Sequence, residues 1–298
     1  QYIEVLIMAS KRKQNIEDLR TATTRKIISQ LEDVQSGDWQ KSWFSFNGCY
    51  NIDTGTVYKG MNQFNLSMLD YDVPMFSTFV GWKKLDCKIK KGSKGHQITK
   101  FSISKKENNL TGAEEIKMYQ DVDYVFNCSQ VDGNIPVHIS QKNPEQTIDK
   151  IELFKEKCLI DTRHILSNRA YYAPLPDQVT MPQYEQFKGS QDYYATLFHE
   201  YAHATGHQSR LNRKFDNSFG DSDYAFEELI AELSSVFTMQ HLGFYENSIR
   251  EDHIQYIKGW LKVLKSDNTF IFKASSLAQK ATDYLIEQSA ENKKVAIS

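Results

Sequence analysis

His199 and His203 stand four residues apart in this chain, and Glu200 directly follows the first of them. On a helix, residues at this spacing lie on one face, so both imidazole rings can reach a single Zn²⁺ ion. Glu200 is then free to take a proton from a water molecule on the ion. This is the HExxH pattern of zinc metallopeptidases. The alternative is a chance match, which we expect about 0.01–0.02 times in a chain of this length.

The residues around the two histidines predict a helix. Residues 191–198 lead into the motif without Gly or Pro, and Gly206 offers a C-cap just after it. The apolar residues that would bury this helix are Ala195, Leu197, Phe198, Ala202 and Ala204. The motif is therefore expected on a helix, as metal binding requires.

A catalytic zinc site usually has a third protein ligand. Ser209 stands where the metzincin pattern has a His, which argues against that class. A second helix, predicted over residues 226–233, favours Glu228 as a gluzincin-like third ligand, and Glu232 as the acceptor for the ring N–H of a ligand His. Glu227 points about 100° away from Glu228 and is predicted at the surface. The alternative for these acids is a solvated helix face.

Two further residues are candidates near this site. His207 follows the end of the first helix, where it could approach the ion, cap the helix or contact a substrate. Tyr224 and His207 are also candidates for stabilising an oxyanion. The predicted chemistry is metal-assisted peptide hydrolysis, with Glu200 as general base and then as acid to the leaving amine.

Several segments of the second half carry a family resemblance: Met181-Pro182, Thr196-Leu197-Phe198-His199-Glu200, His203-Ala204-Thr205-Gly206-His207, Arg210-Leu211-Asn212-Arg213 and Glu227-Glu228-Leu229-Ile230-Ala231-Glu232-Leu233. These segments resemble the C-terminal domain of ArdC-type antirestriction proteins. The similarity extends over nearly the whole chain. It implies a zincin-like metallopeptidase domain and protection of incoming mobile DNA from host restriction.

The first half resembles the single-stranded-DNA-binding domain of this family, at Trp39-Gln40-Lys41-Ser42-Trp43, Tyr58-Lys59-Gly60, Trp82-Lys83-Lys84-Leu85 and Lys90-Lys91-Gly92-Ser93-Lys94-Gly95. One departure is Ser42, where many relatives have Pro. The residues expected to contact DNA are Trp43, Tyr58, Lys59, Trp82, Lys83, Lys84, Lys90, Lys91 and Lys94.

The charge distribution agrees with a nucleic-acid partner for the first half. Residues 1–150 carry a net charge of +2 (20 Lys/Arg against 18 Asp/Glu), and the remaining residues carry −4 (16 against 20). Nine lysines between residues 81 and 106 stand against a single acid, Asp86. A basic strip with aromatic residues nearby is typical of single-strand binding, since phosphates pair with lysines and bases stack on rings. The alternative is a solvated hairpin.

Composition indicates a two-domain protein, and the pattern of expected helices and strands places it in the α+β class. The 298 residues are 40% hydrophobic, which is enough for two cores. We expect a small α+β single-stranded-DNA-binding domain over residues 8–130, beginning at a Met that reads like a natural start. A linker follows over 131–148, and a mainly helical zincin-like domain over 149–298. The four cysteines form no CxxC pair, which favours a reducing cytoplasm. No apolar run approaches the roughly 20 residues of a membrane span.

The expected elements are a helix over residues 15–34, strands over 96–104 and near 124–126 with a turn at 108–112, a helix over 149–164 and a strand over 178–181. We expect the last to be an edge strand that pairs with an extended peptide and holds it over the metal.

Three functions remain open from the sequence. The first is a bifunctional antirestriction protein that binds single-stranded DNA and is a zinc metallopeptidase. The second is a dedicated peptidase whose N-terminal domain recognises a protein substrate, as yet unknown. The third is a DNA-binding protein with an idle metal site, which the intact Glu200 argues against. Zn²⁺ is the expected cofactor, with Mn²⁺ as the other possibility.

Overall fold

The computed structural model describes residues 2–36, 48–69, 71–107, 114–135, 144–213, 222–244 and 260–295. The chain divides into two compact units. The first unit comprises Gln1–Ile27 and Cys49–Val137, and the second comprises Ile28–Gly48 and His138–Ser298. Both units combine helices and strands, which confirms the predicted α+β class.

The first unit is built around a four-stranded sheet in the order β1-β2-β5-β4. Helix α1 (Tyr2–Ser36) runs across the division between the units, which falls after Ile27. The other elements of the first unit are β1 (Tyr50–Asn51), α2 (Gly60–Ser67), β2 (Met75–Thr78), α3 (Phe79–Lys84), β3 (Lys88–Ile89), β4 (His96–Glu107), β5 (Glu114–Asn127), η1 (Cys128–Gln130) and β6 (Val131–Asp132). The helix predicted over residues 15–34 is confirmed as part of α1.

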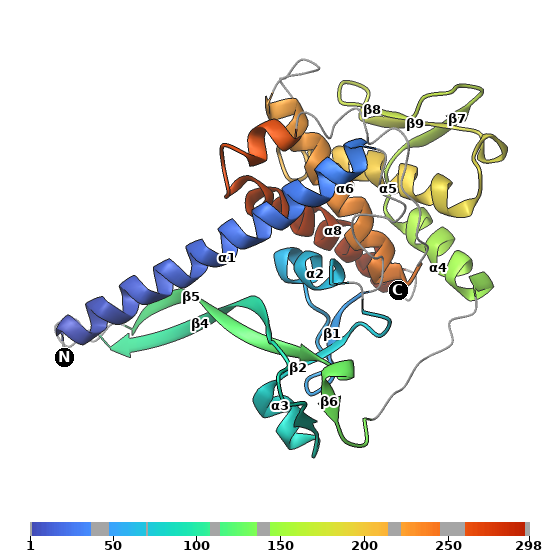
Figure 1. Cartoon of the computed structure of the whole chain (residues 1–298). Helices are drawn as coiled ribbons and strands as arrows, with labels where there is room; N and C mark the ends of the chain where they lie inside the picture. The colour runs from blue at the N-terminus through green and yellow to red at the C-terminus, as the bar shows by residue number, and fades with distance from the viewer. Residues whose placement is uncertain are drawn as a thin grey trace. The chain divides into compact units, whose positions relative to one another are not determined.

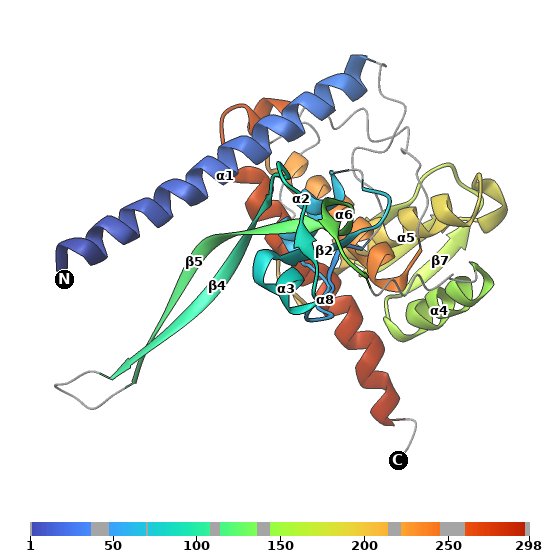
Figure 2. The ribbon, with the colours of Figure 1, turned by 60° about the horizontal axis from the view of Figure 1, so that its bottom comes forward.

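Strands β4 and β5 form a long antiparallel ribbon (Figures 1 and 2) that pairs from His96↔Val125 to Glu107↔Glu114. Both strands were predicted but are longer than the alternating pattern indicated. The predicted turn at 108–112 lies outside the described residues. Part of the predicted linker, 131–148, belongs to regular elements, because Val131–Asp132 form β6 and the next helix begins at Pro144.

The core of the first unit encloses Trp82, which is 0% exposed. Its indole Nε1 donates a hydrogen bond to the carbonyl oxygen of Phe126 at 2.9 Å. A ring in this position cannot stack on a base, so the prediction that Trp82 contacts DNA is wrong. The sequence motif could not show that Trp82 is buried while Lys83 and Lys84 are exposed, because buried and exposed residues follow one another directly in this six-residue helix.

We therefore expect Trp82→Ala to destabilise the first unit by about 3–5 kcal/mol, since it removes a large buried ring and leaves its cavity. Chemical unfolding followed by circular dichroism measures this loss. The control is Phe79→Ala, on the same helix, whose ring is 59% exposed and whose loss should change stability by less than about 0.5 kcal/mol. A Trp82→Ala variant with wild-type stability and weakened DNA binding would restore the original assignment.

The second unit contains a small three-stranded sheet and several packed helices. Its elements are α4 (Pro144–Lys157), β7 (Thr162–Ile165), β8 (Tyr171–Ala173), β9 (Gln178–Pro182), η2 (Tyr184–Gln186), α5 (Ser190–Thr205), α6 (Ser222–Leu242), a short helical segment at 260–264, and α8 (Phe270–Val295). The predicted helix over 149–164 is wrong in its last part. Leu159 adopts a left-handed conformation with φ 50°, and the chain then turns into β7.

The strand over 178–181 is confirmed as β9, but it is not an edge strand. β9 lies between β7, which is parallel to it, and β8, which is antiparallel. Val179, Thr180 and Met181 are all buried, as expected for a central strand covered on both faces. The edges of this sheet are β7 and β8.

Helix α5 packs against α6, and α6 in turn packs against α8. Polar side chains in these interfaces are paired: Ser235 Oγ donates to the carbonyl oxygen of Ala195 at 2.8 Å, and Ser234 Oγ lies 3.2 Å from Thr282 Oγ1. Across the described residues, none of the helices has the length and apolar character needed to cross a bilayer. The four cysteines are buried free thiols.

Candidate metal centre

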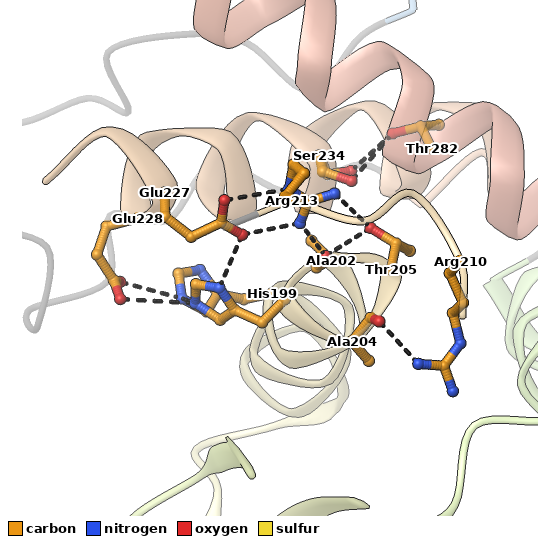
Figure 3. A network of polar contacts seen from close by, with 11 residues as sticks. His199, Ala202, Ala204, Thr205, Arg210, Arg213, Glu227, Glu228, Ser234 and Thr282 are labelled. Atoms are coloured by element: carbon orange, nitrogen blue, oxygen red, sulfur yellow. Dashed lines mark hydrogen bonds and ion pairs between the residues drawn. The ribbon is translucent and has the colours of Figure 1, made fainter. Parts of the chain in front are cut away.

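Helix α5 carries the HExxH motif where the sequence predicts it, and Gly206 is its C-cap. His199 and Glu200 are buried, and His203 is partly buried. Helix α6 crosses beside α5 and brings Glu228, also buried, to the two rings (Figure 3). The two helices thus bring together the three residues that were predicted as metal ligands.

Three donor groups converge between the helices. The Nε2 atoms of His199 and His203 are 3.2 Å apart. Glu228 Oε2 lies 3.4 Å from His199 Nε2, and Glu228 Oε1 lies 3.5 Å from His203 Nε2. A tetrahedral Zn²⁺ ion with bonds of about 2.0–2.2 Å separates its ligands by about 3.3–3.6 Å. The donor types and their spacing therefore fit a divalent metal ion, and these three residues are the group with that geometry among the described residues.

A carboxylate also lies beside the other nitrogen of each ring. His199 Nδ1 is buried without a hydrogen bond of normal geometry, and Glu232 Oε2 lies 3.4 Å from it. His203 Nδ1 lies 3.3 Å from Glu227 Oε1. Carboxylates in such positions fix the tautomer of a metal-binding His and orient its ring. The position of Glu232 agrees with the role predicted for it.

Glu227 is not at the surface, so that prediction is wrong. Its side chain is 12% exposed, and its carboxylate accepts from Arg213 Nε at 3.1 Å and from the Nη2 of the same Arg213 at 2.8 Å. Burial opposes ionisation of Glu227, but the hydrogen bonds from His203 and Arg213 outweigh burial and lower its pKa. Sequence reasoning also missed Arg213, which was noted only as part of the family resemblance.

The charges at this centre stabilise a proton on His199 when no metal ion is bound. Burial alone would lower the pKa of His199, but the adjacent carboxylates of Glu228 and Glu232 outweigh burial and raise this pKa to about 10. In the same way burial disfavours the ionised form of Glu228, yet its contacts with His199 and His203 keep its pKa below the usual value. A metal ion would take the place of the proton on His199.

Glu200 is buried next to His199 on α5 but lies outside the group of three donors. Its charge adds to the field that raises the pKa of His199. Tyr224 also lies at the centre, because its side chain hydrogen-bonds to Glu228 and lowers the pKa of that carboxylate. The catalytic roles of Glu200 and Tyr224 stay predictions.

His207 lies outside the donor group. Its Nδ1 is 2.7 Å from Ser209 Oγ. The same atom is 3.7 Å from Oδ2 of Asp177, a residue of the turn that precedes β9. Arg210 joins the same cluster with two hydrogen bonds to Asp177, at 2.7 and 2.9 Å. A direct ligand role for His207 has no support in this geometry.

Apart from the buried Trp82, the residues predicted to contact DNA divide into three groups. Lys59, Lys83, Lys84, Lys90, Lys91 and Lys94 are exposed. Tyr58 is partly buried and packs edge-on against Phe76 in the core, and Trp43 lies outside the described residues. Two exposed rings that were not singled out for this role are Phe79 (59% exposed) and Tyr124 (50%).

Two protein families match successive parts of the chain. Residues 149–277 match the zincin-like metallopeptidase family, and residues 17–131 match the N-terminal domain of the anti-restriction factor ArdC. The fold and the site thus define a zincin-like metallopeptidase domain joined to an anti-restriction N-terminal domain.

Two crystal structures of the antirestriction ArdC protein from the R388 plasmid are similar to the chain. The metal-free structure has a TM-score of 0.74 at 33% identity, with 92% of this chain and 98% of that one covered. The Mn(II)-bound structure has a TM-score of 0.71 at 31% identity, with 91% and 98% covered. The chain belongs to the ArdC antirestriction protein family.

Two curated proteins are also similar to the chain. An uncharacterized protein of Sinorhizobium fredii, y4eC, is 30% identical over 93% of this chain and 94% of its own length. A DNA primase, TraC of Escherichia coli, is 28% identical over 93% of this chain, but the match spans only 20% of the primase. The chain therefore matches only one part of that larger protein.

Proposed function

We propose that the chain is an antirestriction protein in which a zinc-dependent peptidase site accompanies a single-stranded-DNA-binding domain. The observation that carries the peptidase assignment is the convergence of two imidazole nitrogens and a carboxylate at 3.2–3.5 Å, beside a buried glutamate outside this group. The Mn(II)-bound structure of ArdC from R388 supports a divalent metal ion as a ligand of this chain. The proposed domain bounds are residues 8–130 and 149–298, and the proposed compartment is the cytoplasm.

His199, His203 and Glu228 would hold the ion, and Glu227 and Glu232 would orient the two rings. When bound, the ion supplies Lewis-acid polarisation of a peptide carbonyl and lowers the pKa of water. Glu200 is proposed to take the proton of the attacking water and to pass it to the leaving amine. The Tyr224 hydroxyl, which hydrogen-bonds to Glu228, is proposed to turn to a developing oxyanion and donate to it instead.

We propose β8 as the strand to which an extended peptide adds, in place of β9. β8 is an edge of its sheet and runs antiparallel to β9, so one side of its backbone remains for a further strand among the described elements. Addition to an edge strand binds the peptide main chain in a way that depends little on its sequence. Because this mode of binding does not select a particular sequence, the proposed substrate is a protein whose identity the site does not define.

The proposal for DNA rests on the family match of residues 17–131 and on six exposed lysines. Lys90, Lys91 and Lys94 stand close together in the segment after β3, where their ammonium groups can pair with phosphates. Phe79, exposed on α3 beside Lys83, is the best-placed ring for base stacking in this part of the unit.

Changing Lys90, Lys91 and Lys94 together to Gln should weaken binding of single-stranded DNA. It should also reduce the slope of log affinity against log salt by roughly 0.7 for each phosphate that the protein no longer neutralises. Fluorescence anisotropy with a labelled oligonucleotide at several salt concentrations measures both effects. The matched control changes the exposed lysines Lys188, Lys262 and Lys280 of the second unit to Gln. Equal slopes for the two triple variants would count against the proposed surface.

A transfer assay tests the antirestriction function itself. Unmodified plasmid DNA is conjugated into a restricting host that expresses the wild-type chain, the Glu200→Gln variant or the triple lysine variant. We expect the wild-type chain to raise recovery of transconjugants. If Glu200→Gln protects as well as wild type, peptide hydrolysis is not needed for protection and the DNA-binding domain carries it.

A further inference from the structure

The loop after α5 folds back onto the end of that helix. Leu211 N donates to the carbonyl oxygen of Thr205 at 3.0 Å, and Arg213 N donates to that of Gly206 at 2.8 Å. The fold-back places two arginine side chains at the last turn of α5 (Figure 3), where backbone carbonyls have no partner within the helix. Cations are favoured there by the helix dipole.

Arg213 uses all three of its guanidinium nitrogens in this position. Nη2 donates to the carbonyl oxygen of Ala202 at 2.6 Å, and Nη1 donates to Thr205 Oγ1 at 2.8 Å. Nε and Nη2 donate hydrogen bonds to the carboxylate of Glu227 at 3.1 and 2.8 Å. The side chain is 8% exposed. The same Glu227 carboxylate lies 3.3 Å from His203 Nδ1, so a chain of contacts runs from α5 through Arg213 and Glu227 back to a ring at the metal centre.

Arg210 comes from the same loop and caps the same helix, but its guanidinium binds a different carboxylate. Nη1 donates to the carbonyl oxygen of Ala204 at 2.9 Å, and the guanidinium forms a two-pronged pair with Asp177. This pair ties the helix end to the turn between β8 and β9. Both arginines therefore cap the C-terminal end of α5. They differ in the carboxylate that each guanidinium binds, which is Glu227 for Arg213 and Asp177 for Arg210.

We propose that Arg213 is a positioning residue for the metal centre, acting through Glu227 on the ring of His203. Arg213 donates to both oxygens of the Glu227 carboxylate and so holds Oε1 towards Nδ1 of His203. This keeps the proton on Nδ1 and leaves the Nε2 lone pair facing Glu228 and His199. Lysine cannot replace arginine in this role, because a single ammonium cannot grip a carboxylate with two parallel bonds and also reach Thr205 and Ala202. The inference rests on the proposed metal-binding function.

The test titrates the metal-stripped full-length chain with Zn²⁺ and, separately, with Co²⁺. We expect Arg213→Lys and Glu227→Gln each to lower metal affinity about 10–100-fold, the usual effect of losing a group that orients a ligand His. The visible spectrum of bound Co²⁺ should change in both variants. The double variant should lose little more than either single one, because both changes break the same chain of contacts.

Arg210→Lys is the matched control, because it disturbs a cap of the same helix without touching Glu227. It should lower the unfolding temperature of the metal-free chain while its Zn²⁺ affinity stays within about twofold of wild type. Equal losses of affinity in Arg210→Lys and Arg213→Lys would assign the effect to helix capping and overturn the proposal. Wild-type affinity and an unchanged Co²⁺ spectrum in both Arg213→Lys and Glu227→Gln would do the same.

The design keeps three outcomes apart. If Arg213→Lys does not fold, Glu227→Gln decides alone, because it leaves the contacts of Arg213 with Ala202 and Thr205 in place. If the wild-type chain itself binds neither ion, the proposed metal function fails and the positioning role fails with it. If wild type binds and the variants bind equally well, only the role of Arg213 is refuted.

Discussion

Changing Glu200 to Gln should lower peptide hydrolysis by about 10²–10⁴-fold, the usual contribution of a general acid–base group, while one metal ion per chain stays bound. Gln has the size of Glu but cannot take a proton from the attacking water. Because Glu200 lies outside the three donors, its loss should leave the affinity for the ion nearly unchanged. The fold should also remain, since the replacement fills the same buried space.

A quenched fluorescent peptide library and elemental analysis of the purified variant measure the two quantities. Glu185→Gln, an exposed change in η2, serves as the control and should behave as wild type in both. Loss of the metal in Glu200→Gln would mean that this carboxylate is a ligand. Undiminished hydrolysis would mean that another group accepts the proton.

Removing a ligand should have the largest effect on the metal itself. We expect His199→Ala, His203→Ala and Glu228→Ala each to weaken Zn²⁺ binding by about 10²–10³-fold or more, since a free energy of about 10–16 kcal/mol is shared by about four ligands in a typical site. Competition with a chromophoric chelator measures the affinities. His207→Ala is the control and should keep its metal, because its ring contacts Ser209 instead. Full zinc in Glu228→Ala with none in Glu232→Ala would exchange their roles.

The pH dependence of metal binding follows from the raised pKa of His199. In the metal-free chain this ring keeps its proton up to a pKa of about 10, so protons compete with the ion at every pH below that value. The apparent affinity should therefore rise with pH, by about tenfold per unit for each proton displaced. In Glu232→Gln one of the two carboxylates that raise this pKa is replaced by a neutral amide, so the competing proton is held less tightly. Chelator competition at several pH values should then show the rise in affinity levelling off at a lower pH for this variant than for wild type.

The helix of the metal centre could be predicted because its signals are local. Residues four apart share a helix face whatever the helix packs against, so His199 and His203 were assigned as partners from spacing alone. Glu228 required one more step, the choice of a carboxylate from a second helix. Its residue type and one-turn spacing to Glu232 were sufficient for that choice.

Glu227 shows what sequence periodicity cannot predict. The angle of about 100° from Glu228 is correct for a helix, but it says nothing of what lies on that side. In the structure that side holds Arg213 and His203, which come from another helix and its loop. The crossing of α5 and α6 decides the environment of Glu227, and no pattern within either segment reports it.

Two other errors have the same origin. Trp82 lies in a segment rich in exposed lysines, yet its own ring fills the core of the first unit. β9 lies just before the metal helix in the chain, but strand order places it in the middle of its sheet. In both cases the neighbours in space differ from the neighbours in sequence.

The contact between α6 and α8 bears on how the chain is made in the cell. The metal ligands all precede α8, but the face of α6 that carries Ser234 and Thr238 pairs with Thr282 of α8. During synthesis, α6 therefore leaves the ribosome before Thr282, whose hydroxyl pairs with Ser234 and Thr238. Stable capture of an ion is thus expected only after α8 has also been made and has docked on α6, and any activity that depends on the ion would begin only then.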